Sequence, residues 1–88
     1  MRKFVYAPIF VRQFKKLGEN LKEEVWEKIE MFRDVSNHKT LRVHKLSGPF
    51  EGRYSFSVNY NFRIVFSYSN KKKEVNLLAI GDHDVYKN

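Results

Sequence analysis

The stretch that decides the fold is residues 48–86, which read GPFEGRYSFSVNYNFRIVFSYSNKKKEVNLLAIGDHDVY. In residues 53–60, aromatic or apolar side chains alternate with polar ones, which is the period of a strand with one dry and one wet face. Residues 62–68 repeat the alternation after a break that is short enough for a hairpin. Residues 74–81 are apolar on both faces, as expected of an inner strand. The stretch therefore predicts three strands in an antiparallel meander.

The alternation also predicts which side chains share a face of the sheet. The dry face of the first strand is expected to hold Tyr54, Phe56, Val58 and Tyr60. Its wet face is expected to hold Arg53, Ser55, Ser57 and Asn59. In the last strand, one face is expected to hold Val75, Leu77 and Ala79, and the other Asn76, Leu78 and Ile80. Arg63 of the middle strand falls on the wet face, where its neighbours along that strand are small or apolar.

Two helices are predicted before this stretch. Residues 3–6 favour a short strand that stops before Pro8, a residue suited to a first helical turn. Apolar residues then recur at spacings of three and four, the pattern of two amphipathic helices. The two stripes are Phe10, Phe14 and Leu17, and Leu21, Val25, Ile29 and Phe32. Gly18 is expected to end the first helix, and Asn20 with Glu23 resembles a capping box that starts the second.

A polar and basic segment connects the helices to the three strands. The helical pattern fades at residues 34–37, and the residues that follow are predicted to form a loop with apolar anchors at Leu41 and Val43. Arg42, His44 and Lys45 lie just before the strands in the sequence. Positive charge is therefore concentrated beside the wet face of the sheet.

These elements predict an α+β fold with the order β-α-α-β-β-β in a single domain, residues 1–88. Both amphipathic helices need an apolar surface, and each alternating strand offers one dry face. We therefore expect a helical hairpin on one face of a small, mainly antiparallel twisted sheet, with the other face open. His83 and Tyr86 follow the last strand and are expected at the rim of that open face.

The charge balance favours a polyanionic partner. The chain has 17 Lys and Arg against 10 Asp and Glu, a net charge of +7. It has no cysteine, which excludes a disulfide framework and a Cys-based zinc site. No apolar run has the length of a signal-peptide core or a membrane span. We expect a soluble, cytoplasmic protein with no membrane association.

Motifs for metal and nucleotide chemistry are missing from the sequence. The histidines at positions 38, 44 and 83 are scattered, and none forms the i,i+4 pair of a helical zinc site. There is no Gly-x-Ser-x-Gly turn, no P-loop and no Gly-x-Gly-x-x-Gly. The sequence therefore predicts neither a metal nor a cofactor.

The remaining polar residues fit metal-free cleavage of RNA. In that reaction the 2′-hydroxyl attacks its own phosphorus, which requires a base, a cation for the phosphoryl oxygens and an acid for the leaving 5′-oxygen. Arg63 suits the cation because its guanidinium can hold two phosphate oxygens. His83 and His44 are candidates for proton transfer, and Tyr86 for stacking or proton donation. A structural role stays open for each of them, with Arg63 paired to a nearby aspartate.

At these residues the chain resembles the RelE/ParE superfamily of bacterial toxin–antitoxin systems. The matching segments are residues 44–48, 52–58, 62–66 and 79–86, which read HKLSG, GRYSFSV, FRIVF and AIGDHDVY. The N-terminal strand and the helical hairpin match in order and length, so the resemblance covers essentially the whole chain. It implies the RelE-like microbial RNase fold.

The resemblance also implies a function and partners. Members of the RelE, YoeB and YafQ type are similar to small, metal-independent endoribonucleases that enter the ribosomal A site and cut mRNA, and each is silenced by a cognate antitoxin. The chain is therefore expected to be an mRNA interferase toxin that inhibits translation. Its expected partners are the ribosome with its 16S rRNA, mRNA, and an antitoxin protein in a toxin–antitoxin hetero-oligomer.

Site residues are carried over from the resemblance by position. Arg63 matches the arginine that RNA-cutting members place on the scissile phosphate. His83 matches a histidine of YafQ-like members and an arginine of RelE-like ones, Tyr86 matches their C-terminal aromatic residue, and His44 lines up with a histidine of YafQ-like toxins. The residues expected to contact RNA are Arg42, Lys45, Arg53, Ser55, Ser57 and Asn61.

The chain departs from the family pattern around the general base. RelE has lysines where Ser55 and Ser57 stand, and YafQ has a histidine near Ser57 and an aspartate near Asn61. Two alternatives therefore stay open. ParE-type relatives share the fold but resemble inhibitors of DNA gyrase, and a weakly active antitoxin-binding module is the other alternative. Retention of the arginine, the histidine and the terminal tyrosine favours the nuclease.

Overall fold

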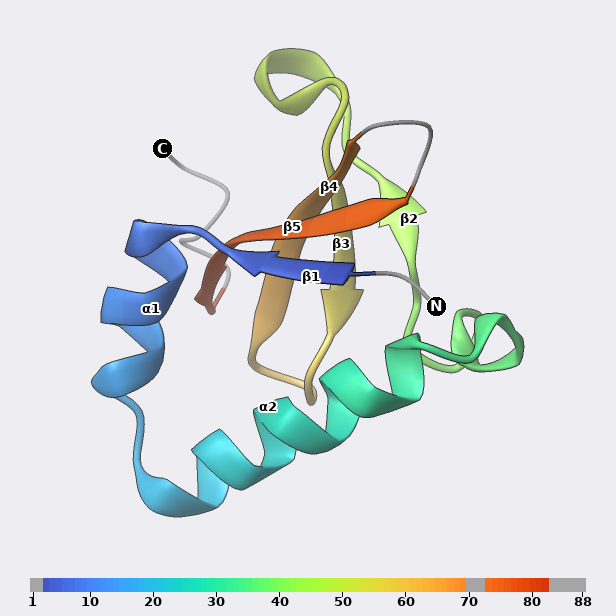
Figure 1. Ribbon diagram of the computed structural model, residues 1–88. Helices are drawn as coiled ribbons and strands as arrows, with labels where there is room; N and C mark the ends of the chain where they lie inside the picture. The colour runs from blue at the N-terminus through green and yellow to red at the C-terminus, as the bar shows by residue number, and fades with distance from the viewer. Residues whose placement is uncertain (1–2, 70–72, 83–88) are drawn as a thin grey trace.

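The computed structural model describes residues 3–69 and 73–82, and its centre is a five-stranded mixed sheet (Figure 1). The elements are β1 (Lys3–Tyr6), α1 (Pro8–Lys15), α2 (Glu19–Phe32), the 3₁₀ turn η1 (Val35–Asn37), β2 (His44–Lys45), the 3₁₀ turn η2 (Gly48–Phe50), β3 (Tyr54–Ser57), β4 (Arg63–Ser69) and β5 (Glu74–Gly81). The strand order is β1-β5-β4-β3-β2. β1 runs parallel to β5, and every other pair is antiparallel. The predicted α+β fold and the meander of β3, β4 and β5 are confirmed.

The sequence did not predict β2. It is only two residues long, and it pairs with β3 through His44 opposite Ser55 and Lys45 opposite Tyr54. Two residues are too few to produce a period, so the sequence predicts a loop here, and the structure corrects this. The pairing makes β2 an edge strand and places His44 on the sheet.

Both helices start where the local sequence allows it, but the predicted capping box is wrong. α1 begins at Pro8, whose missing N–H costs nothing in a first turn. α1 ends at Lys15, before the predicted boundary, and Gly18 serves instead as the N-cap of α2 in an extended conformation (φ −68°, ψ 160°) without a side-chain hydrogen bond. Asn20 therefore lies inside the first turn of α2 and is exposed. Neither helix of the described part has the length and apolar composition of a membrane span.

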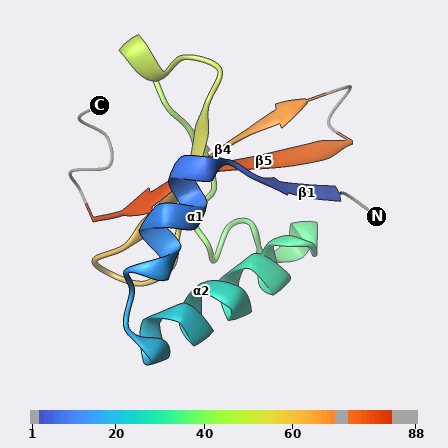
Figure 2. The same ribbon diagram turned by 60° about the vertical axis from the view of Figure 1, so that its left-hand side comes forward.

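The main core lies between α2 and one face of the sheet (Figure 2). Val25, Ile29 and Phe32 of the predicted stripe are at most 1% exposed. The other fully buried members are Phe10, Leu41, Phe56, Val58, Ile64, Phe66, Val75, Leu77 and Ile80. The Phe32 ring joins α2 to the sheet, with centroid distances of 5.0 Å to Phe56 and to Phe66. The amphipathic pattern of the helices thus predicts the core correctly.

β5 changes face along its length because of a β-bulge. Val65 of β4 pairs with Ala79, whereas Phe66 pairs with Leu77, which leaves Leu78 as the extra residue on β5. The bulge brings Ile80 to the buried side that Leu77 faces, so the simple alternation predicted for this strand is wrong. β5 is nevertheless an inner strand, as predicted.

β1 pairs with β5 only as far as Leu77, and α1 provides a hydrogen-bond partner for the end of β5 that follows. Ala7 N–H donates to Leu77 O (3.0 Å), which is the last backbone hydrogen bond between the two segments. Gln13 of α1 then accepts a hydrogen bond from Ile80 N–H through its side-chain Oε1 (2.8 Å). A side chain therefore replaces the missing neighbouring strand at the end of β5.

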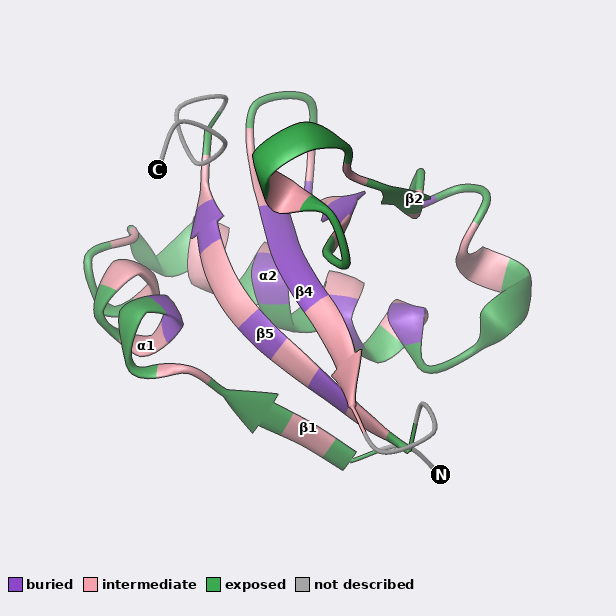
Figure 3. Ribbon diagram, turned by 90° about the horizontal axis from the view of Figure 1, so that it is seen from above, coloured by how far each residue is buried: buried purple, intermediate pink, exposed green. Residues whose placement is uncertain are grey.

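The face of the sheet away from α2 is less open than predicted. Ser55 and Val65, which are register partners across β3 and β4, are 0% and 2% exposed, although both were expected on the open face. The segment that carries η2 crosses in front of β4 on this side (Figure 3). Ser57 and Arg63, at one end of the sheet, keep partial exposure on this face.

Phe32→Ala should destabilise the fold by about 3–5 kcal/mol, because it removes a ring that contacts helix, sheet and loop at once. Phe32→Leu should cost less than half as much. Trp26→Ala is the control. Because Trp26 is 45% exposed, this variant should lose much less free energy of unfolding. Urea denaturation of the three variants measures the difference. Equal losses for Phe32→Ala and Trp26→Ala would contradict the central role of Phe32.

Candidate functional site

Arg63 is the first residue of β4, and the pairing of the strands determines its neighbours. Ser57, the last residue of β3, is its register partner on one side, and Gly81 of β5 is its partner on the other. Side chains of paired residues lie on the same face of a sheet. Arg63 and Ser57 therefore share the polar end of the face away from α2.

Two hollows meet at these residues. The larger, about 860 Å³, lies at the hairpin between β3 and β4, and the smaller, about 450 Å³, lies toward η2. The larger hollow is lined by Glu24, Lys28, Thr40, Leu41, Arg42, Ser57, Val58, Asn59, Tyr60, Asn61, Arg63 and Asp82. The smaller is lined by Arg42, His44, Leu46, Ser47, Phe50, Ser57 and Arg63. Arg42, Ser57 and Arg63 line both, so they form the wall between the two hollows.

Arg42 reaches this wall from the loop after α2, and its backbone is strained. Its φ is +59°, in the left-handed region that residues with a Cβ seldom adopt. Leu41 before it is 2% exposed, and Leu41 O accepts a hydrogen bond from Ser57 N–H (2.8 Å). Val43 N–H donates to His38 O (3.0 Å). Arg42 is therefore held between two fixed neighbours, directly beside the register partner of Arg63.

The segment that leads from α2 to Arg42 is itself fixed by hydrogen bonds. The Ser36 hydroxyl and N–H both donate to Asp34 Oδ1 (2.8 and 2.9 Å), and these bonds hold the pKa of Asp34 below its usual value. The ring of His38 stacks on Phe32 at 4.3 Å, and its Nε2–H donates to Phe32 O (2.8 Å). Both features are structural, which leaves His38 outside the site.

The ring orientation of His44 follows from one hydrogen bond. His44 Nδ1 lies 2.8 Å from Arg42 O. A carbonyl oxygen only accepts, so Nδ1 carries the proton, and in the neutral ring Nε2 is left as an acceptor. His44 is exposed and lines the smaller hollow with Arg63. The contact thus turns the basic nitrogen of the ring away from the loop backbone.

The structure brings some of the predicted site residues together and separates others. Arg42, His44, Ser57, Asn61 and Arg63 line the two adjoining hollows. Lys45 and Arg53 line a third hollow near η2, which Arg63 does not reach. Ser55 is completely buried, which corrects its expected place on an open surface. The predicted catalytic residues His83 and Tyr86 lie outside the described residues.

The larger hollow also includes residues that the sequence analysis did not assign to a site. Among them are Lys28 of α2, Thr40, Tyr60 and Asp82. Tyr60 was expected on the dry face of a strand, but it lies in the hairpin loop and is 93% exposed. The sequence carried a partial signal for this in the flanking asparagines, which favour turns. The sequence carried no indication for Lys28, because the spacing of residues along α2 does not show which other segments the helix lies beside.

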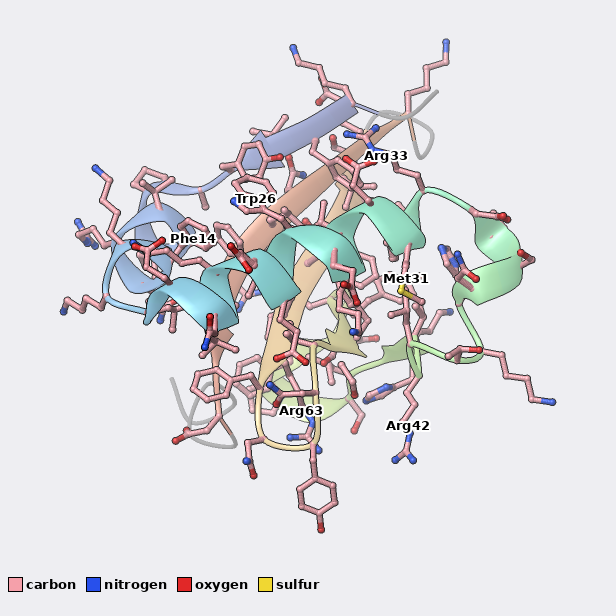
Figure 4. The ribbon with its side chains drawn as sticks, turned by 90° about the horizontal axis from the view of Figure 1, so that it is seen from below. Phe14, Trp26, Met31, Arg33, Arg42 and Arg63 are labelled. Atoms are coloured by element: carbon pink, nitrogen blue, oxygen red, sulfur yellow. The ribbon has the colours of Figure 1, made fainter. Side chains whose placement is uncertain are left out.

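Charge is distributed unevenly around this site. α2 carries five of the ten acidic residues of the chain and only two lysines, so the excess of positive charge lies on the rest of the molecule. Lys28 is the only lysine of α2 at the larger hollow, and its Nζ lies 3.1 Å from Glu27 Oε1. Arg42 and Arg63 lie on the same side of the molecule, away from Phe14 and Trp26 (Figure 4). The arginines thus mark the basic end of the sheet.

The described residues do not form a metal centre. Across residues 3–69 and 73–82, no group of three or more His, Asp or Glu side chains is placed to hold an ion. The charged side chains and the imidazole at the two hollows are those of Arg42, Arg63, Lys28, Glu24, Asp82 and His44.

The sequence matches no family model and no curated protein. Solved structures, in contrast, match over nearly the whole chain. A YafQ mutant from E. coli has a TM-score of 0.72 at 15% identity and covers 100% of both chains. The YoeB–YefM complex from Staphylococcus aureus has a TM-score of 0.73 at 15% identity over 94% of this chain and 98% of that one. The E. coli RelBE toxin–antitoxin complex has a TM-score of 0.71 at 17% identity over 93% and 96%. The chain has the fold of the RelE, YafQ and YoeB toxins, as the resemblance predicted.

The left-handed backbone at Arg42 leads to a prediction about stability. Arg42→Gly should be more stable than Arg42→Ala by about 1 kcal/mol, because both lose the guanidinium but only glycine adopts φ +59° without strain. Urea denaturation of the two variants measures this difference. Equal stabilities would mean that the loop relaxes when the arginine is removed, and that the backbone stores no strain.

Proposed function

We propose that this protein is the toxin of a toxin–antitoxin system and that it cuts mRNA on the ribosome as a metal-independent endoribonuclease. The observation that carries the proposal is the wall formed by Arg42, Ser57 and Arg63, with His44 beside it. Two guanidinium groups at adjoining hollows suit a phosphodiester with negative charge on its oxygens. The RelE-like fold supports the same conclusion.

In the proposed reaction, Arg63 stabilises the charge that develops on the phosphoryl oxygens. Its backbone is held on both sides by strand pairing, so its side chain starts from a fixed position. A cation that is already in place when charge develops needs no reorganisation, which is the main benefit of such a contact. Arg42 supplies a second positive charge from the loop.

His44 is proposed as the general base that takes the proton of the 2′-hydroxyl. The hydrogen bond from Nδ1–H to Arg42 O leaves Nε2 as the acceptor in the neutral ring. Positions 55 and 57 hold serines instead of lysines. His44 of β2, which is the register partner of Ser55, is the proposed replacement. His83 and Tyr86 are proposed, from the resemblance, as the acid for the 5′-oxygen and as a stacking or proton-donating group.

An antitoxin is proposed to cover the opposite side of the molecule. Tyr6 and Trp26 are 38% and 45% exposed on β1 and α2, and Ile9 on α1 is 52% exposed, so large apolar side chains lie at the surface of these elements. Tyr6 and Phe14 hold the Trp26 ring at centroid distances of 5.9 and 5.3 Å. An amphipathic antitoxin helix would bury this surface, and its acidic groups would neutralise the basic end of the sheet.

Arg63→Ala should lower mRNA cleavage on purified ribosomes at least about 100-fold, because one oriented electrostatic contact is lost. The fold should be unchanged, since Arg63 lies at the end of a strand and outside the core. Arg12→Ala is the charge-matched control, because Arg12 is exposed on α1, where it lines neither hollow at the site. Primer extension measures the cuts. Cleavage by Arg63→Ala at the rate of Arg12→Ala would remove Arg63 from the proposed site.

Expression of the protein alone in bacteria should stop translation before DNA replication. Pulse labelling with methionine and thymidine measures the order of arrest, and mapping of mRNA ends should reveal cuts in register with the reading frame. DNA-damage signalling with intact mRNA would instead support inhibition of DNA gyrase, as in ParE-type relatives. Growth without any arrest would support a module that only binds antitoxin.

A further inference from the structure

Tyr60 is the most exposed large hydrophobic side chain among the described residues, at 93%. It lies between β3 and β4 and lines the same hollow as Arg42 and Arg63. Within the described residues its ring has no aromatic neighbour and its hydroxyl has no hydrogen-bond partner. The side chain therefore contributes almost nothing to the packing of the described part of the fold.

The exposure of Tyr60 is not the result of a loose loop. Asn59 Oδ1 accepts hydrogen bonds from Asn61 N–H (2.8 Å) and Phe62 N–H (2.9 Å), and Val58 N–H donates to Phe62 O (2.9 Å). Asn59 Nδ2 also donates to Glu24 Oε1 (2.7 Å), which ties the loop to α2. The backbone is thus fixed on both sides of Tyr60, and the ring is presented to solvent from a stable position.

Val58 and Phe62, on either side of the loop, anchor it to the core. Val58 is 1% exposed and belongs to the core, and Phe62 packs against the core as a partly buried residue. The apolar residues on either side of the loop therefore point inward while Tyr60 points outward. A fixed turn therefore exposes the Tyr60 ring to solvent, and a bound ligand would be needed to bury it.

The neighbours of Tyr60 indicate what kind of ligand would fit. Arg42 and Arg63 bring two positive charges to the hollow, and Asn61 next to Tyr60 brings amide groups. A nucleotide has a flat base and an anionic phosphate one sugar apart. Proteins that bind single-stranded nucleic acid combine an aromatic stacking surface with a cationic path for the backbone in the same way.

We propose that Tyr60 is a stacking platform for one nucleobase of single-stranded RNA, whose neighbouring phosphate lies on Arg42 and Arg63. This inference rests on the proposed function, because it names the nucleotide-binding surface of the same site. Stacking accepts any base, so Tyr60 adds affinity and positions the strand without selecting a sequence. The hydroxyl is not required, because the ring face makes the contact.

The test compares Tyr60→Leu, Tyr60→Phe and wild type in binding a short single-stranded RNA with 2′-O-methyl groups, which block cleavage. Fluorescence anisotropy measures the affinity. Tyr60→Leu should bind about tenfold more weakly, and Tyr60→Phe should bind within about twofold of wild type. The melting temperature should be the same for all three, because the side chain is exposed. Equal binding by Tyr60→Leu and wild type, or an equal loss in Tyr60→Phe, would overturn the proposal.

Two further measurements separate stacking from charge. An RNA with one abasic position should lose affinity for wild type but not for Tyr60→Leu when that position is the stacked one. Salt dependence should be unchanged in Tyr60→Leu, whereas Arg42→Ala should lower the slope of log affinity against log salt by about one. A reduced slope in Tyr60→Leu, or equal losses from every abasic position in both proteins, would overturn the proposal.

The outcomes also distinguish this inference from the proposed function. If wild type binds the RNA with the expected Tyr60 effect but cuts no mRNA on ribosomes, the nuclease proposal fails and the stacking platform stands. If it cuts mRNA and Tyr60→Leu binds as wild type does, only the inference fails. Wild-type protein with no measurable affinity for single-stranded RNA would overturn the inference directly.

Discussion

The contact on which the structure depends most is the packing of Phe32 at the end of α2. Its ring lies 5.0 Å from Phe56 on β3 and from Phe66 on β4, so one side chain joins the helix to two adjacent strands. It also lies 6.1 Å from Phe4 on β1 and 4.3 Å from His38 after the helix. The hydrogen bond from His38 to Phe32 O makes the chain turn back toward the sheet at this point. The loop that carries Arg42 therefore starts from a position that the core determines.

The site is assembled through backbone contacts, and this explains how distant residues converge. Leu41 O accepts a hydrogen bond from Ser57 N–H, and Ser57 is the register partner of Arg63. Backbone contacts alone therefore fix the loop and the two strands relative to one another. His44 joins the same arrangement through Arg42 O. In a site held in this way, backbone hydrogen bonds and strand pairing fix the loop and the two strands before a ligand binds. Such preorganisation is what electrostatic stabilisation of a transition state requires.

Periodicity predicted both helices, the three strands of the meander and most of the core, because burial of one face repeats along a helix or a strand. It failed where a single contact decides the outcome. Gly18 caps α2 in place of Asn20, and the bulge at Leu78 moves Ile80 to the buried face. Tyr60 leaves the strand pattern because Asn59 closes the turn one residue earlier. For the site, the sequence predicted which residue types take part, but not that Ser55 is buried or that Arg53 lies in another hollow, since both depend on contacts across the chain.

The burial of Ser55 has a consequence for the chemistry of the proposed reaction. Ser55 is enclosed between His44 and Val65 in the register of the sheet and has no exposed surface. A lysine at this position would have to place a charged amine where Ser55 is now covered, and an unpaired buried charge is costly. Positive charge for the proposed reaction therefore comes from other parts of this chain. Arg42 can supply this charge, because it lies on a loop held by backbone hydrogen bonds and lines the same hollow as Arg63.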